Sequence, residues 1–87
     1  MEIKWHEKAW GQYIEWQMKD KKILNKINIL IKDIQRCNSK DGLGKPELLK
    51  GELSGYQSRR IDKENRIVYK YSDDSLYIIQ CGGHYIK

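Results

Sequence analysis

The sequence predicts an α+β fold in which two N-terminal α-helices pack on one face of a small antiparallel β-sheet, in the order β-α-α-β-β-β. Three observations predict it: an alternating segment at the start, a helical hydrophobic period after it, and strand-like segments towards the end. The 87 residues indicate a single domain, residues 1–87. Because a chain of this size buries only roughly 60 to 65% of its unfolded surface, the core is small and a homodimer is a possible assembly.

The opening segment "EIKW" alternates charged and apolar residues and predicts a strand with Ile3 and Trp5 on one face. From about His6, a helix-entry residue, the period becomes helical. The first helix has a stripe made of Trp10, Tyr13, Ile14 and Gln17. The second helix, after "KDKK", has an apolar face made of Ile23, Leu24, Ile27, Leu30, Ile31 and Ile34. Trp16 and Ile29 lie off these stripes and face either the core or a partner chain.

A loop-rich segment, "NSKDGLGKPELLKGELSG", follows the helices. Pro46 fixes its own φ and disfavours helix at Lys45, so Glu47 follows a stiffened segment. The segments "YQSRRI", "RIVYKY" and "SLYIIQC" predict three strands joined by the turns "DKEN" and "SDD". Consecutive strands with short turns pair in an antiparallel manner.

Charge and cysteine content narrow the class of protein. The chain has seventeen Lys and Arg and twelve Asp and Glu, a net charge of +5. This charge favours a polyanionic partner but does not recognise a particular nucleotide sequence. Cys37 and Cys81 lack metal-ligand spacing, so we expect no metal site and no disulfide scaffold. The N-terminus has no apolar run, so we expect no signal peptide, no membrane span and a cytoplasmic location.

The predicted strands and the preceding loop are rich in cations, interleaved with tyrosines. The cations are Lys45, Lys50, Arg59, Arg60, Arg66 and Lys70. Such a face suits single-stranded RNA, since arginines meet phosphates and bases stack on aromatic rings. A solvated basic face with tyrosines at the edge of the core is the alternative. A four-residue loop from Asp62 to Asn65 would place Ile61 opposite Arg66 and Arg60 on the other face, whereas an odd loop or a bulge would reverse this.

A possible acid–base pair involves His84, which follows Gly82 and Gly83 in "CGGHY". Histidine exchanges a proton near neutral pH, and Glu47 could act as the base across a cleft. Arg66 would then neutralise charge that develops on phosphate, and RNA could be cleaved by the neighbouring 2′-hydroxyl without a metal. Each residue also has a structural interpretation: a solvated loop acid, a strand-surface cation and a tail residue.

The stretch "GLGKPELLKGELSGYQSRRIDKENRIVYKY" together with "CGGHY" resembles the Txe/YoeB branch of the RelE-type bacterial toxins. The spacing of Trp5, Trp10, Tyr13 and Trp16 extends the similarity over nearly the whole chain. The resemblance implies a RelE-like fold and a type II toxin that cleaves mRNA in the ribosomal decoding site. It also implies neutralisation by a YefM/Axe-type antitoxin.

By this resemblance, Glu47 matches the general base, His84 the general acid and Arg66 the arginine that stabilises the transition state. Tyr85 matches a terminal tyrosine that orients phosphate or base. Lys50 and Arg60 match supporting basic residues, and no metal or cofactor is implied. Departures from the family pattern are Leu48, Gly82 and the extension Ile86-Lys87. A non-catalytic RNA- or ribosome-binding module, a degenerate toxin, remains the alternative function.

Overall fold

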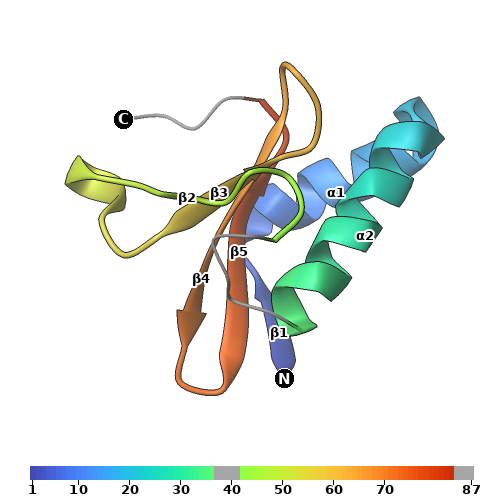
Figure 1. The fold of residues 1–87 in the computed structure, drawn as a ribbon. Helices are drawn as coiled ribbons and strands as arrows, with labels where there is room; N and C mark the ends of the chain where they lie inside the picture. Colours follow the sequence, from blue (N-terminus) through green and yellow to red (C-terminus); the bar gives the residue numbers. More distant parts are fainter. Residues whose placement is uncertain (37–41, 84–87) are drawn as a thin grey trace.

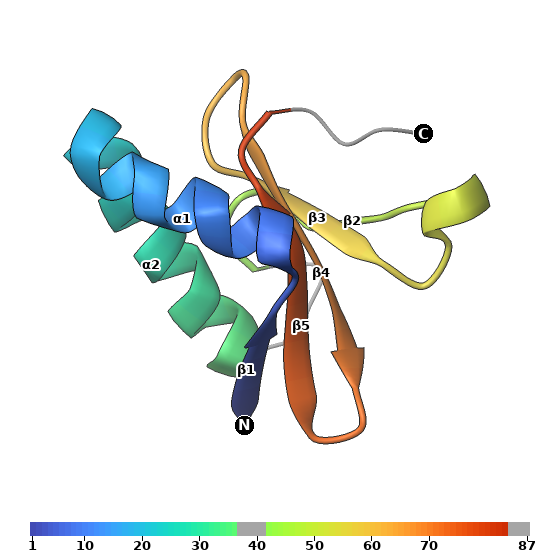
Figure 2. The same ribbon diagram turned by 180° about the vertical axis from the view of Figure 1, so that it is seen from behind.

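The computed structural model describes residues 1–36 and 42–83 and has two helices beside a five-stranded sheet (Figure 1). The elements, in chain order, are β1 (Glu2–Trp5), α1 (Glu7–Lys19), α2 (Lys21–Arg36), β2 (Glu47–Leu48), the 3₁₀ helix η1 (Gly51–Leu53), β3 (Gln57–Arg60), β4 (Arg66–Ser72) and β5 (Ser75–Cys81). Both views show α1 and α2 on the same side of the sheet (Figures 1 and 2). The predicted α+β architecture is therefore confirmed, with the two-residue strand β2 added.

The strand order of the sheet is β1-β5-β4-β3-β2. The pairs β2–β3, β3–β4 and β4–β5 are antiparallel, as predicted for strands joined by short turns. The pair β1–β5 is parallel, with Glu2 opposite Ser75, so the sheet is mostly rather than wholly antiparallel. These two strands come from opposite ends of the chain, so no hairpin turn dictates their direction.

The second helix buries the face that its periodicity predicts. Ile27, Leu30 and Ile34 are almost completely buried, and Ile31 is nearly so. They share the core with apolar residues of one face of the sheet: Ile67, Tyr69, Leu76, Ile78 and Cys81. Ile3 and Trp5 of β1 pack against the same cluster, which confirms the predicted face of the first strand.

The first helix buries a face that shares Tyr13 with the predicted stripe but is turned towards Ala9 and Trp16. Trp10 and Ile14 are 47% and 46% exposed, whereas Ala9 is fully buried and Trp16 packs against the core. The small Ala9 lets α1 approach β5, and the Trp16 indole donates a hydrogen bond to the Cys81 carbonyl at 2.8 Å. Trp16 is thus a core residue.

The boundaries of α1 and the exposure of Ile29 follow the sequence more closely. Ile29 is 51% exposed. The expected helix-entry residue His6 caps α1, because its Nδ1 accepts a hydrogen bond from the Lys8 N–H. At the next boundary, Asp20 accepts hydrogen bonds from the N–H groups of Lys22 and Ile23 at the start of α2.

Candidate functional site

Glu47 lies on β2 at the edge of the sheet. A tight turn precedes it, in which Gly44 and Lys45 both have positive φ, +79° and +53°. The Gly44 carbonyl accepts a hydrogen bond from the Arg60 N–H at 2.7 Å, which ties this turn to β3. Lys45 thus lies in the left-handed region, outside the right-handed helical region that the following Pro46 disfavours. Glu47 pairs with Ser58, and its side chain is half exposed.

Arg66 opens β4 and points to the same side as Glu47. Ser58 pairs with both Glu47 and Val68, and Arg66 lies two residues before Val68, so all four side chains share one face of the sheet. This face is opposite the helices, and we call it the distal face. The Arg66 guanidinium Nη1 lies 3.9 Å from Glu47 Oε2, and its side chain is only 17% exposed. The fold thus brings together two of the predicted site residues that are far apart in sequence.

Arg60 lies directly opposite Arg66, so the predicted loop parity was wrong. The loop between β3 and β4 covers residues 61–65, an odd number. It closes because Asp62 accepts hydrogen bonds from the N–H groups of Glu64 and Asn65, while the Ile61 N–H reaches the Asn65 carbonyl. These bonds lower the pKa of Asp62 against the opposing effect of its burial. Arg60 is exposed and shares the distal face with Arg66.

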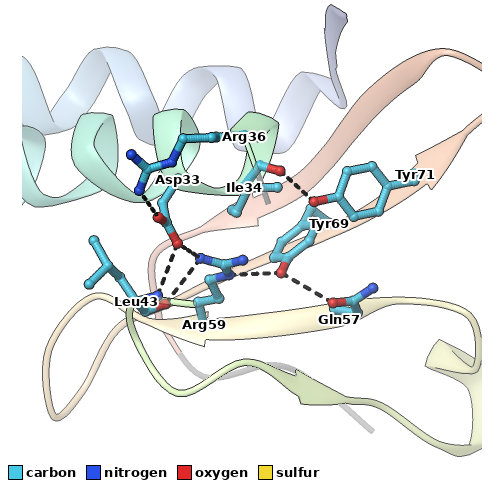
Figure 3. Close-up of polar contacts among 8 residues, drawn as sticks. All are labelled: Asp33, Ile34, Arg36, Leu43, Gln57, Arg59, Tyr69 and Tyr71. Carbon is cyan, nitrogen blue, oxygen red and sulfur yellow. Dashed lines mark hydrogen bonds and ion pairs between the residues drawn. The ribbon is translucent and has the colours of Figure 1, made fainter. Parts of the chain in front are cut away.

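Arg59 is fully buried, which corrects its assignment as a substrate-binding residue. Its guanidinium forms an ion pair with Asp33 and donates hydrogen bonds to the Leu43 carbonyl at 3.2 Å and the Tyr69 hydroxyl at 3.0 Å (Figure 3). Asp33 also accepts hydrogen bonds from the Leu43 N–H and from Arg36. The Leu43 bond, followed by the Arg59 bond, lowers the Asp33 pKa to about 2. The pair joins α2, β3 and the turn before Glu47.

Neighbouring bonds extend this buried network. The Tyr69 hydroxyl donates to Gln57, and the Tyr71 hydroxyl donates to the Ile34 carbonyl of α2 (Figure 3). A Cβ atom at Gly42 would lie 2.7 Å from the Arg59 guanidinium nitrogens, so the chain passes directly over the ion pair. The turn that leads to Glu47 is therefore held by the protein core.

The end of β5 is attached to α1 and to the β3–β4 loop. The Cys81 N–H donates to the Gln12 side chain at 2.9 Å, next to the Trp16 bond. The Gly83 N–H donates to the Asn65 side-chain oxygen at 2.8 Å, and the Gly83 carbonyl accepts from the Arg66 N–H at 2.9 Å. Gly83 is the last described residue, and the chain leaves the described region beside Arg66.

The remaining predicted site residues have separate positions. His84 and Tyr85 lie outside the described residues. Lys45 and Lys50 are exposed, and Lys50 lines the same hollow as Glu47, with a volume of about 590 Å³. Sequence reasoning missed Asn65, which holds Gly83. The turn signal "DKEN" indicated a connection, but nothing in it pointed to a contact with Gly83.

The pair Glu47–Arg66 offers a carboxylate that can accept a proton beside a fixed positive charge. Within residues 1–36 and 42–83, no group of three His, Cys, Asp or Glu side chains is arranged to hold a metal ion. Neither helix of the described chain is long and apolar enough to cross a membrane.

Comparisons with known proteins identify the family. The sequence profile described as YoeB-like toxin of bacterial type II toxin-antitoxin system matches residues 5–85. The chain belongs to this family. Toxin YoeB of Escherichia coli K12 is 52% identical over 85 residues, which cover 98% of this chain and 100% of that protein. Toxin YoeB of a Synechocystis strain is also 52% identical, covering 98% of each chain.

Solved structures of YoeB-type toxins share the fold. A YoeB/ParE toxin from Agrobacterium tumefaciens has a TM-score of 0.92 and 45% identity, covering 98% of this chain and 100% of that one. A YoeB toxin in a heterotetrameric YoeB–YefM complex from Staphylococcus aureus has a TM-score of 0.89 and 44% identity, covering 98% of both chains. E. coli YafQ, at 19% identity and a TM-score of 0.76, shares the fold alone.

Proposed function

We propose that this YoeB-family toxin is a ribosome-dependent endoribonuclease that cleaves mRNA in the decoding site and so stops translation. The observation that carries the proposal is the approach of Glu47 and Arg66 to 3.9 Å on the distal face. Family membership supports the toxin role, and the net charge of +5 favours attraction to RNA.

In the proposed reaction, Glu47 removes the proton from a ribose 2′-hydroxyl, and the 2′-oxygen attacks the adjacent phosphorus. The bond from phosphorus to the 5′-oxygen breaks, and His84 supplies the proton that this oxygen needs. The products are a 2′,3′-cyclic phosphate and a 5′-hydroxyl end. Arg66 stabilises the negative charge on the phosphate oxygens in the transition state. No metal or cofactor takes part.

Other residues have supporting roles in this proposal. Tyr85 orients the phosphate or a base, and Lys45, Lys50 and Arg60 bind neighbouring phosphates. The bonds from Gly83 to Asn65 and Arg66 support the role of His84, because they hold the residue before it beside the proposed phosphate clamp. Arg59 has no role in binding RNA, since the core encloses it.

We also propose a YefM/Axe-type antitoxin as partner, a homodimer as a possible assembly and a cytoplasmic location. The YoeB–YefM complex and the YoeB dimer solved for Staphylococcus aureus support the first two. Trp10, Ile14 and Met18 form an exposed apolar row on α1, at a spacing that places them on one side of the helix. This row is a candidate contact for either partner chain.

The test uses purified protein, translating ribosomes and mapping of new 5′ ends on the message. Glu47→Gln and His84→Gln should each lower the cleavage rate by about a hundred- to ten-thousand-fold, because each removes a positioned proton acceptor or donor. Glu2→Gln, the same change at an exposed carboxylate on β1, at the opposite edge of the sheet from Glu47, should cleave like the unmodified protein.

Ribosome binding measured in parallel distinguishes the enzyme from a non-catalytic binding module. The enzyme keeps its ribosome affinity in the Glu47→Gln and His84→Gln variants while cleavage falls. An unmodified protein that binds ribosomes and produces no new 5′ ends would establish the binding module instead.

A further inference from the structure

Two tyrosine rings flank a lysine on the distal face, away from the proposed acid–base residues. Lys70 and Tyr77 are direct cross-strand partners on β4 and β5, and Tyr56 precedes β3. The Lys70 Nζ lies 5.0 Å from the Tyr56 ring centre and 5.7 Å from the Tyr77 ring centre. All three side chains are half-buried, so each keeps part of its surface in water.

A hollow of about 330 Å³ lies against these rings. Its lining includes Tyr56, Tyr77, His6, Lys8 and Gln80. No carboxylate occurs among the described residues that line it. We call this feature, with Lys70 at its side, the tyrosine–lysine hollow. Exposed ring faces beside cations are typical of sites where a nucleobase stacks and a phosphate binds.

The hollow lies on the same face as the proposed cleavage residues. Along β4, Arg66, Val68 and Lys70 alternate onto the distal face, and Gln80 in the hollow pairs with Val68. Lys70 lies four residues after Arg66, which is about 13 Å along the strand. Neighbouring nucleotides of one bound RNA strand can span this distance.

We propose that the tyrosine–lysine hollow binds an unpaired base of single-stranded RNA and its phosphate. This nucleotide would lie on the same face as the phosphodiester bond that is cleaved at Glu47 and Arg66. The base stacks on a tyrosine ring, Tyr77 foremost, while Lys70 meets the phosphate. Lys8 in the lining and Lys70 beside it, with no carboxylate among the described lining residues, favour an occupant that carries a phosphate. The apolar lining residues Leu53 and Ile79 suit the uncharged base. That the RNA strand bound in the hollow is also the strand that is cleaved rests on the proposed function.

The first test measures binding of a short RNA in which every ribose carries a 2′-O-methyl group, so that the 2′-oxygen cannot attack. A single 2-aminopurine is moved through the sequence, and quenching of its fluorescence reports stacking on a ring. The unmodified protein should quench the probe strongly at one position. Tyr77→Leu should abolish this quenching and weaken binding about tenfold, whereas Tyr77→Phe, which keeps the ring, should retain both.

A second pair of variants tests the lysine by charge. Lys70→Gln should weaken binding and reduce the slope of log affinity against log salt by about one, because one phosphate contact is lost. Lys32→Gln makes the same charge change on the exposed side of α2 and should leave the slope unchanged. Lys70 is partly exposed, so this variant keeps the core intact even if Tyr77→Leu folds poorly.

Equal affinity and equal quenching in Tyr77→Leu and the unmodified protein would overturn the proposal, as would quenching that does not depend on probe position. Equal slopes of log affinity against log salt for the two lysine variants would show that Lys70 does not contact a phosphate. The cleavage assay separates this inference from the proposed function. Loss of cleavage in Glu47→Gln, with RNA binding unaffected by Tyr77→Leu, would reject the hollow alone. If Tyr77→Leu loses RNA binding while the unmodified protein shows no cleavage, the hollow is supported and only the proposed enzyme activity is rejected.

Discussion

Replacing Arg59 by methionine should destabilise the protein strongly without a specific effect on RNA binding. The substitution removes the cation that faces Asp33 and the donors for the Leu43 carbonyl and the Tyr69 hydroxyl (Figure 3). Removing one partner of a buried ion pair costs about 3–5 kcal/mol, and we expect the lower end of this range because the exposed Arg36 still bonds Asp33. A chain of 87 residues has a total stability of roughly 4–13 kcal/mol, so this is a large share.

The pH dependence of this loss is a sharper test. The pKa of Asp33 is lowered from 3.8 to about 2, so its contribution to stability is complete above pH 3.8 and is lost as the pH falls towards 2. Without Arg59, the Asp33 pKa rises, and the carboxyl takes up a proton at higher pH. The destabilisation by Arg59→Met should therefore be larger near neutral pH than near pH 3.

Urea unfolding at both pH values gives the free energies, and the double variant Asp33→Asn with Arg59→Met is the control. The double variant removes both charges and should be more stable than Arg59→Met alone. A loss below about 1 kcal/mol at neutral pH, with no difference at low pH, would refute the reasoning. A folded Arg59→Met protein with weakened RNA affinity would restore Arg59 as a substrate-binding residue.

Four further predictions follow from the site and the core. Arg66→Lys should slow single-turnover cleavage at least tenfold, because a point charge cannot reproduce a planar fork; an unchanged rate would exclude Arg66 as the phosphate clamp. The rate of single-turnover cleavage should depend on pH through two ionisations, and His84→Gln should remove one of them; two ionisations in that variant would assign the acid elsewhere. Leu30→Ala should lower the free energy of unfolding by about 2–5 kcal/mol in urea titrations, since Leu30 is fully buried, and a loss under about 1 kcal/mol would contradict the assigned core. Burial raises the pKa of Cys81 to about 12, so in a Cys37→Ser background alkylation, followed by mass spectrometry, should be slow until the protein unfolds; rapid alkylation of the native protein would contradict this burial.

The two helices and four of the five described strands show how much of the fold the sequence predicts. The sequence of α2 shows a long apolar face, and the strand segments alternate between short turns. Few arrangements bury all of this apolar surface, and a sheet covered by helices on one face is one of them. The strand β2 was missed because a segment of two residues is too short to show an alternation of apolar and polar side chains. The buried face of α1 was misplaced because Trp10 and Ile14 looked apolar, while Ala9 allowed the close contact with β5.

The two adjacent arginines show what the sequence alone could not decide. Arg59 and Arg60 have the same chemistry, and a shift of one residue in the hairpin exchanges their faces. Hydrogen bonds of Asp62 closed an odd loop, which sent Arg59 to Asp33 in the core and Arg60 to the distal face beside Arg66.

Residue types and local periodicity determined the elements of this protein, its cationic character and the residues able to move a proton, since these are properties of short segments. Tertiary structure alone decided which cation is buried, which strand lies parallel to β5 and which side chains meet across the distal face. Those outcomes depend on register and on contacts between distant segments, whose free energies are settled only when the whole chain packs.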